Sequence, residues 1–265
     1  MADMDDFLSD TAALYGDTVP LDDGMIRYGP LVLTVAPKEG KASALANTLL
    51  ADHLFSPSLL LAEFIERGII SLSGKIIVEL GAGCALPSLL SSTLSEPPSL
   101  VVITDYPDDT IMKNLTANVQ RNRPHVNEKC VVHARGYEWG QDVAPLLDIA
   151  STHPSHSPDR GFDVVILSDL LHFDRSHDVL LHSLLALLRR APSARAYVAA
   201  GTYTAPHVCA HFVSAAAEAG IVLEEGEVEP VWRGELGVSG GGLDREQLGV
   251  RKGMSRWWVG RWVDS

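Results

Sequence analysis

Two glycines and two acidic residues that follow short apolar runs are the residues of this chain whose spacing suggests chemistry. Gly81 and Gly83 come soon after the run at 76–78, and Glu79 stands just before them. Glycine lets a ligand lie close to the backbone because it carries no Cβ atom. Asp105 ends the next apolar run, where a carboxylate can accept hydrogen bonds from both hydroxyls of a ribose. This spacing predicts a site for an adenosine-type ligand.

The glycine pattern also separates the classes of ligand that carry a ribose. A dinucleotide fingerprint needs a third glycine, and this chain has Leu86 in that place. No Gly-Lys-Ser/Thr triplet follows, so the turn is not a P-loop. Glu79 would repel a pyrophosphate but suits a cation with an amino-acid tail. We therefore expect S-adenosylmethionine as the cofactor, with an NAD-dependent reductase as the less favoured alternative.

These residues come together only if the chain forms parallel β-α-β units. The runs at 76–78 and 100–104 predict strands, and 85–94 predicts the helix between them, with Pro87 in its first turn. The helix from Asp108 to Arg121 carries Asn114 and Asn118 on one face, which we expect to be surface. Further strands are predicted at 131–135, 162–167, 195–202, 221–228 and 255–263, with a flexible loop at 234–249.

The N-terminal part has a different pattern from the rest of the chain. Residues 1–24 are acidic and predict a poorly ordered tail or an arm that docks elsewhere. Residues 25–36 alternate and predict a β-hairpin outside the main sheet, with its turn at Gly29 and Pro30. Ser56 is predicted to cap the next helix. We expect an N-terminal extension at residues 1–50 and one main domain at residues 51–265.

Composition limits the partners and the compartment. Hydrophobic residues make up 46% of the 265 residues, and no apolar run is long enough for a membrane span. The net charge of −13 argues against a nucleic-acid partner and suits a basic protein or a cationic substrate. The acidic N-terminus does not resemble a signal peptide, and three scattered cysteines predict free thiols. We expect a cytoplasmic protein, without a metal site at His153 and His156.

Four segments in order, VELGAGCALPS, TDYPD, GYEWG and ILSDLLHF, resemble the motif series of the family 16 seven-β-strand methyltransferases. Within that family the chain is similar to the fungal nicotinamide N-methyltransferase-like branch. That branch includes a methyltransferase of the N-terminus and a nearby lysine of translation elongation factor 1-alpha. The resemblance implies a Rossmann-like α/β fold: a seven-stranded, mostly parallel sheet with helices on both faces and an antiparallel last strand.

The resemblance also implies which residues hold the cofactor. Phe55 stands where the family has an aromatic residue beside the methionine part, although a core role is equally open. Trp139 stands where the family has a Trp beside the adenine, and Tyr106 either stacks on the adenine or packs on its loop. Ser168 ends the strand at 162–167, where ligands bind in open α/β sheets. Asp105 has a helix cap as its alternative role.

Asp169 and His172 are the residues that we expect to act on the substrate. They match a family motif of an acidic residue followed by an aromatic one, with His172 as a departure in the aromatic place. Methyl transfer needs a neutral amine held in line with the methyl carbon. The Asp169 carboxylate can hold that amine and stabilise its developing positive charge. His172 could accept the proton, because its ordinary pKa lies near the working pH, but we favour the role of a polar loop residue over that of a base.

Together these features predict an S-adenosylmethionine-dependent N-methyltransferase of a protein lysine or N-terminal amine. By resemblance, elongation factor 1-alpha is the first candidate substrate. A small-molecule N-methyltransferase for a pyridine such as nicotinamide is an alternative. A non-catalytic binding module is another, but the intact set of glycines and acidic residues argues against it.

Overall fold

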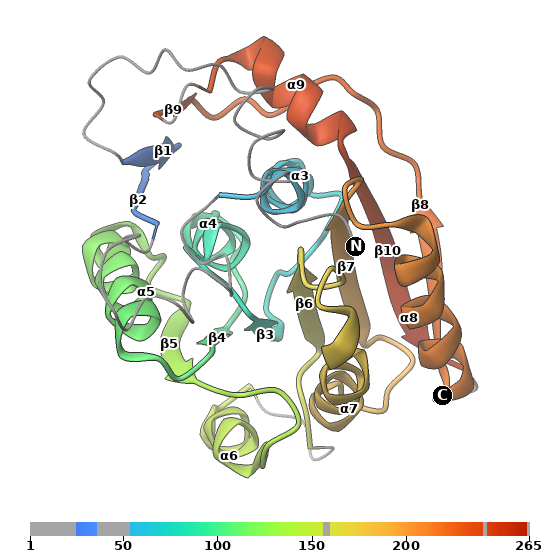
Figure 1. Cartoon of the computed structure of the whole chain (residues 1–265). Helices are drawn as coiled ribbons and strands as arrows, with labels where there is room; N and C mark the ends of the chain where they lie inside the picture. The colour runs from blue at the N-terminus through green and yellow to red at the C-terminus, as the bar shows by residue number, and fades with distance from the viewer. Residues whose placement is uncertain (1–24, 36–53, 156–159, 241–242, 264–265) are drawn as a thin grey trace.

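The computed structural model describes residues 25–35, 54–155, 160–240 and 243–263, and a seven-stranded sheet forms its centre (Figure 1). The strands lie in the order β5-β4-β3-β6-β7-β10-β8. Neighbouring strands pair in parallel up to β7, and β10 pairs antiparallel with both β7 and β8. This confirms the predicted fold class. The strands are β3 (Ile76–Leu80), β4 (Leu100–Asp105), β5 (Val131–Gly136), β6 (Val164–Ser168), β7 (Arg195–Gly201), β8 (Ile221–Gly226) and β10 (Ser255–Trp262).

Helices cover both faces of the sheet (Figure 1). Successive strand residues point to opposite faces, so Ile77 packs with α3, α4 and α5 while Val78 packs with α6, α7 and α8. All residues of β3 and β6 are buried, as expected for Val- and Ile-rich strands covered on both sides. The helices are α3 (Ser56–Glu66), α4 (Leu86–Thr93), α5 (Asp109–Asn122), α6 (Ala144–Thr152), α7 (His177–Leu187), α8 (Pro206–Glu218) and α9 (Arg245–Gly253).

The predicted hairpin is present and lies outside the main sheet. Strands β1 (Ile26–Tyr28) and β2 (Leu31–Leu33) pair antiparallel, and β9 (Val238–Ser239) adds a third strand that we did not predict. Gly29 adopts a φ of 53° in the turn, a conformation that glycine reaches without strain. The acidic residues 1–24 and the proposed boundary at residue 50 lie outside the described residues.

Two asparagines of α5 attach the hairpin to the main domain. The Asn118 carboxamide accepts a hydrogen bond from the amide of Thr34 at 2.9 Å and donates one to its carbonyl at 2.7 Å. Asn122 makes the same pair of bonds with Val32, both at 2.8 Å. Our prediction of a surface role is therefore wrong for Asn118, which is fully buried. Its amide group satisfies the backbone of an edge strand, as a neighbouring strand would do.

Helix α3 begins one residue before the predicted point. Phe55 is the N-cap residue, with extended φ and ψ of −82° and 152°, and Ser56 is already helical. The Ser56 hydroxyl lies 3.4 Å from Nε of Arg251 and does not cap the helix. Our prediction of Ser56 as N-cap is therefore wrong, because a tertiary contact has taken the hydroxyl that capping would need.

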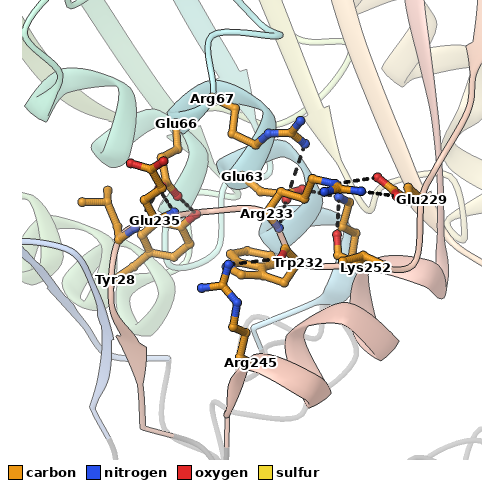
Figure 2. Close-up of polar contacts among 12 residues, drawn as sticks. Tyr28, Glu63, Glu66, Arg67, Glu229, Trp232, Arg233, Glu235, Arg245 and Lys252 are labelled. Atoms are coloured by element: carbon orange, nitrogen blue, oxygen red, sulfur yellow. Dashed lines mark hydrogen bonds and ion pairs between the residues drawn. The ribbon is translucent and has the colours of Figure 1, made fainter.

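The predicted flexible loop at 234–249 contains β9 and the beginning of α9. Asp244 and Gln247 form a reciprocal capping box at the N-terminus of α9. Figure 2 shows how Glu66 of α3 contacts the segment that precedes α9. Oε1 of Glu66 accepts hydrogen bonds from the amides of Glu235 and Leu236, at 2.5 and 2.7 Å. The glycines of this segment obscured a capping signal that the sequence does contain.

A buried ion pair joins α3 to α9 (Figure 2). Nζ of Lys252 lies 2.5 Å from Oε2 of Glu63, and both side chains are almost completely buried. Oε1 of Glu63 accepts the amide of Arg233 at 2.5 Å. The ion pair and this bond fix the segment from β8 to β10 against the helix that begins at the candidate site.

Cys84, Cys130 and Cys209 are buried free thiols, as predicted. Burial raises the pKa of the Cys84 thiol to about 12, so this thiol is protonated and unreactive at neutral pH.

In the described parts of the chain, no helix has the length and apolar character needed to cross a membrane.

Candidate cofactor and active site

A cavity of about 210 Å³ lies where β3, β4 and β6 end, at the edge where ligands bind in sheets of this type. Its lining comes from the turn after β3, the ends of β4 and β6, the loop after β5 and the start of α3. Nine of the ten site residues predicted from the sequence line it: Phe55, Gly81, Gly83, Asp105, Tyr106, Trp139, Ser168, Asp169 and His172.

The turn after β3 needs its two glycines for different reasons. Both adopt positive φ, 57° at Gly81 and 56° at Gly83. A Cβ atom on Gly81 would lie 2.7 Å from Cδ2 of Leu170 and 3.0 Å from the Trp139 ring, so packing excludes a side chain there. A Cβ atom on Gly83 would meet nothing within 4 Å. Gly83 therefore leaves open space in the cavity wall, where a ligand can approach the backbone.

Asp105 ends β4 and faces this turn. Its carboxylate accepts hydrogen bonds from the amides of Gly83 at 2.6 Å and Tyr106 at 2.7 Å. Burial raises its pKa to about 6, although these two donors act in the opposite direction. The N-cap of α5 is Asp108, which accepts the amides of Thr110 and Ile111. Asp105 is therefore not the cap of that helix, and its position at the cavity agrees with a ribose-binding role.

Glu79 is the predicted site residue that does not line the cavity. It still belongs to β3, so its side chain leaves one face of the sheet and points toward α4. Its Oε2 accepts the amide of Ser88 at 3.2 Å, and Oε1 has no hydrogen-bond partner among the described residues. Burial raises its pKa to about 8. The structure thus places Glu79 behind the glycine turn and outside the cavity lining, and its contact with the cofactor stays a prediction.

Aromatic rings form one wall of the cavity. Trp139 is half-buried, and its ring lies edge-on to Phe173 with the centroids 5.7 Å apart. The loop that carries it is held by Ser183 of α7, whose hydroxyl contacts the Tyr137 hydroxyl at 2.9 Å and accepts the Gly140 amide at 2.8 Å. Trp139 therefore packs on the α7 side of the core and also faces the cavity.

The start of α3 brings a serine to the site beside Phe55. The Ser58 hydroxyl lies 2.9 Å from that of Ser168, and both residues line the cavity with Phe55. Arg251 of α9 donates to the carbonyl of Leu54 and so holds the residue before Phe55. The sequence signal that points to Ser58 is the predicted start of this helix. A side chain in the first turn of α3 faces the carboxyl ends of the strands, where the cavity lies.

Asp169 follows β6, which lies on the other side of β3 from the strand that Asp105 ends. It adopts a φ of 63°, and its amide donates to the carbonyl of Ala199 at 2.8 Å. Oδ1 accepts the amide of Gly201 at 3.1 Å, and Oδ2 accepts the hydroxyl of Tyr203. Burial raises the pKa of Asp169 to about 6, and both hydrogen bonds act against that rise. At neutral pH the carboxylate is therefore mostly ionised and can receive a further donor.

His172 lines the cavity as a neutral ring. Neither ring nitrogen has a hydrogen-bond partner among the described residues, although both atoms are buried. Burial lowers its pKa to about 4, which the nearby main chain of Asp169 partly offsets. A base with this pKa would bind a proton only weakly at neutral pH. Its predicted role as a base stays a prediction, and the geometry favours a wall residue packed on Phe173, 4.0 Å away between ring centroids.

Comparison with known proteins agrees with this geometry. A family model described as lysine methyltransferase, family 16, matches residues 43–205. The chain belongs to this lysine methyltransferase family. The family resemblance read from the four sequence segments is therefore confirmed, and the matched region contains every predicted site residue.

Curated relatives within the family are fungal proteins named protein N-terminal and lysine N-methyltransferase EFM7. The chain is 34% identical to that of Gibberella zeae over 153 residues, which are 56% of each chain. It is 30% identical to that of Neurospora crassa over 226 residues, 82% of this chain and 75% of the relative. The match thus spans little more than half of the Gibberella relative.

Solved structures with a similar chain path are more distant. A putative RNA methyltransferase from Pyrococcus horikoshii is 16% identical, with 77% of this chain and 81% of that chain covered and a TM-score of 0.40.

Proposed function

We propose that this chain is an S-adenosylmethionine-dependent protein N-methyltransferase that acts on a lysine or an N-terminal amine. The observation that carries the proposal is one cavity lined by Asp105 and the Gly83 turn, and also by Asp169, with β3 lying between the strands that Asp105 and Asp169 end or follow. The first carboxylate suits a ribose, and the second suits an amine. Family membership and the printed names of the fungal relatives support the same activity.

The residues of the cavity fit the proposed cofactor. When bound, S-adenosylmethionine supplies a methyl group on a cationic sulfonium. The Asp105 carboxylate would accept the ribose hydroxyls, Trp139 and Tyr106 would contact the adenine, and the open side of Gly83 would admit the ligand to the backbone. Leu86, in place of the third glycine of a dinucleotide fingerprint, argues against NAD.

Asp169 would act on the acceptor amine. Its ionised carboxylate accepts an N–H of the neutral amine, which fixes the direction of the nitrogen lone pair. The same charge stabilises the positive charge that develops on nitrogen during transfer. The rings of Phe55, His172 and Phe173 line the cavity with it and exclude water from the carboxylate. We assign no proton-accepting step to His172, because its pKa of about 4 is too low for that purpose.

The choice of a particular substrate and of a cellular location rests on the family resemblance and on the net charge. We propose translation elongation factor 1-alpha as the first substrate to test, and a cytoplasmic location follows from that choice. The net charge of −13 suits a basic protein substrate. The relatives' printed names support a protein amine rather than a pyridine such as nicotinamide as the acceptor.

A transfer assay tests this function. The purified chain would be given methyl-labelled S-adenosylmethionine with a cell lysate, with purified elongation factor 1-alpha, and with nicotinamide in separate reactions. We expect label in one protein band of the lysate and in the elongation factor, and mass spectrometry would locate it on an amine. Label in methylnicotinamide alone would overturn the protein assignment.

A binding control separates the cofactor from the substrate. S-adenosylhomocysteine at about a hundred times its Kd should raise folding stability by nearly 3 kcal/mol. Stabilisation by NAD and not by S-adenosylhomocysteine would disprove the cofactor assignment. The Asp169→Asn variant should bind S-adenosylhomocysteine normally while its turnover falls on the order of a hundredfold or more.

A further inference from the structure

The Asp169 carboxylate accepts hydrogen bonds from two groups at the end of β7, one in its last residue and one in the turn that follows. Gly201 donates its amide to Oδ1, and Tyr203, 34 residues after Asp169 in the chain, donates its hydroxyl to Oδ2. Strand β7 is the neighbour of β6, so the two strand ends bring these residues together. A carboxylate has about four acceptor positions. Two of them therefore remain for a donor that enters from the cavity.

The Tyr203 ring packs against the backbone of Gly201, in a space that we call its seat. A Cβ atom on Gly201 would lie 2.1 Å from a ring carbon, so only glycine leaves room for the ring in this position. Gly201 lies outside the positive-φ region, so its residue type reflects packing. The ring lies 6.4 Å from Phe55 and 6.5 Å from His172, between centroids. Tyr203 is not among the residues that line the cavity, so any effect on a ligand there would pass through Asp169.

The backbone of Asp169 supports a functional reason for this arrangement. Its φ of 63° is a left-handed conformation that costs on the order of 1 kcal/mol for a residue with a side chain. The conformation turns the carboxylate toward the cavity, where the residue is only 4% exposed. Such a side chain needs fixed partners to keep one direction, and Gly201 and Tyr203 supply them.

We propose that Tyr203 is a positioning residue, whose hydroxyl keeps the Asp169 carboxylate ionised and aimed at the acceptor amine. The inference rests on the proposed function of Asp169 and adds a residue to it. A hydrogen bond donated by Tyr203 favours the charged form of Asp169, because a protonated acid accepts it less well. An ionised Asp169 is also the form that stabilises positive charge on the amine.

The pH dependence follows from the groups that face Asp169. These are Tyr203 itself, His172 on the same loop, and Cys209 on α8, whose pKa Asp169 helps to raise. His172 is neutral above pH 5 and Cys209 is buried and protonated, so neither changes charge near neutrality. Burial raises the pKa of Asp169 to about 6, and the Tyr203 bond lowers it. Loss of the hydroxyl should therefore raise this pKa further, toward neutral pH.

The first test is Tyr203→Phe, which removes the hydroxyl and keeps the ring in its seat. Carbon NMR of labelled aspartate, assigned by comparison with Asp169→Asn, would report the pKa of Asp169 directly. We expect proton binding at Asp169 to become about tenfold tighter, the size expected from one charge-assisted hydrogen bond. In the profile of kcat against pH, the fall on the acid side should move to higher pH by about one unit, which corresponds to this tenfold change. The Kd of S-adenosylhomocysteine should stay unchanged.

The matched control is Tyr28→Phe. The Tyr28 hydroxyl also donates to a carboxylate, Oε2 of Glu66 at 2.6 Å, but far from the cavity. This variant should lose stability and leave the pKa of Asp169 and the pH profile unchanged. A second variant, Gly201→Ala, keeps the hydroxyl but denies the ring its seat, and should reproduce the shift seen with Tyr203→Phe.

The outcomes separate this inference from the proposed function. An unchanged pKa of Asp169 in Tyr203→Phe, with a folded protein, would overturn the positioning role even if the wild type methylates protein. A raised pKa together with a shifted kcat profile would support it. A wild type that transfers no methyl group would defeat the proposed function, and the NMR measurement would still decide whether Tyr203 controls the carboxylate.

Discussion

The amide nitrogen of Gly83 lies 2.6 Å from Oδ2 of Asp105, so the turn after β3 is bonded directly to the carboxylate that ends β4. One bond therefore aligns the two features that the sequence predicts as a cofactor site. It also places the open side of Gly83 next to the carboxylate that would accept ribose hydroxyls. The first prediction follows from this relationship.

Asp105→Ala should weaken binding of S-adenosylhomocysteine by about 10- to 100-fold, because it removes hydrogen bonds to a charged group. Isothermal titration calorimetry would measure this loss. Asp108→Ala is the matched control, since Asp108 caps α5 and does not line the cavity. The control should lose about 1 kcal/mol of stability and keep its affinity. Equal losses of affinity in the two variants would contradict the ribose role of Asp105.

Binding of the same ligand should depend on pH through Asp105. Ribose hydroxyls donate to the ionised carboxylate, so protonation of Asp105 competes with the ligand. Burial raises its pKa to about 6, and the affinity should be constant above about pH 7 and fall below pH 6 by up to about tenfold per unit. Titrations from pH 5 to 8 would show this. Asp169→Asn should keep the dependence, because Asp169 follows β6 and is separated by β3 from the strand that Asp105 ends.

Glu79→Gln should remove part of the pH dependence of folding. Burial raises the pKa of Glu79 from 4.5 to about 8, so the native state keeps a proton that the unfolded chain releases in this window. The stabilisation is complete below pH 4.5 and is lost as the pH rises to 8, at roughly 1.4 kcal/mol per pH unit. Glutamine can still accept the Ser88 amide but does not ionise. Urea unfolding of both proteins from pH 5 to 8 would reveal the difference, and parallel curves would contradict it.

Lys252→Met should destabilise the fold by about 3 kcal/mol, because it leaves the Glu63 carboxylate buried without its closest cation. Arg67, at 3.6 Å, compensates only in part. The double variant with Glu63→Gln should lose less than the sum of the two single changes. Arg261→Ala is the control, since its partner Glu224 is 58% exposed and such pairs contribute less than about 1 kcal/mol. Denaturant midpoints would measure all four proteins, and additive losses would argue against coupling.

Local patterns were sufficient for much of this fold. The apolar runs predicted the strands of the sheet, and β10 was correctly expected to be antiparallel. The two glycines and Asp105 were assigned because each depends on a few neighbouring residues: a positive φ, a strand end, the next turn. Trp139 was assigned through the family motif around it, which is also local. Such features are repeated wherever the same residues occur in the same order.

Contacts between distant segments were decided by the tertiary structure alone. The sequence placed Glu79 at the cavity, but β3 continues through it and its side chain points to α4. The chain separation is 84 residues between Asn118 and Thr34, and 34 residues between Asp169 and Tyr203. Local sequence patterns do not show which residues, so far apart in the chain, come into contact in the fold. The sequence by itself determined which segments form the strands and which residues stand near their ends. Packing of the sheet and helices decided which of them face the cavity, because direction and burial depend on every neighbouring element at once.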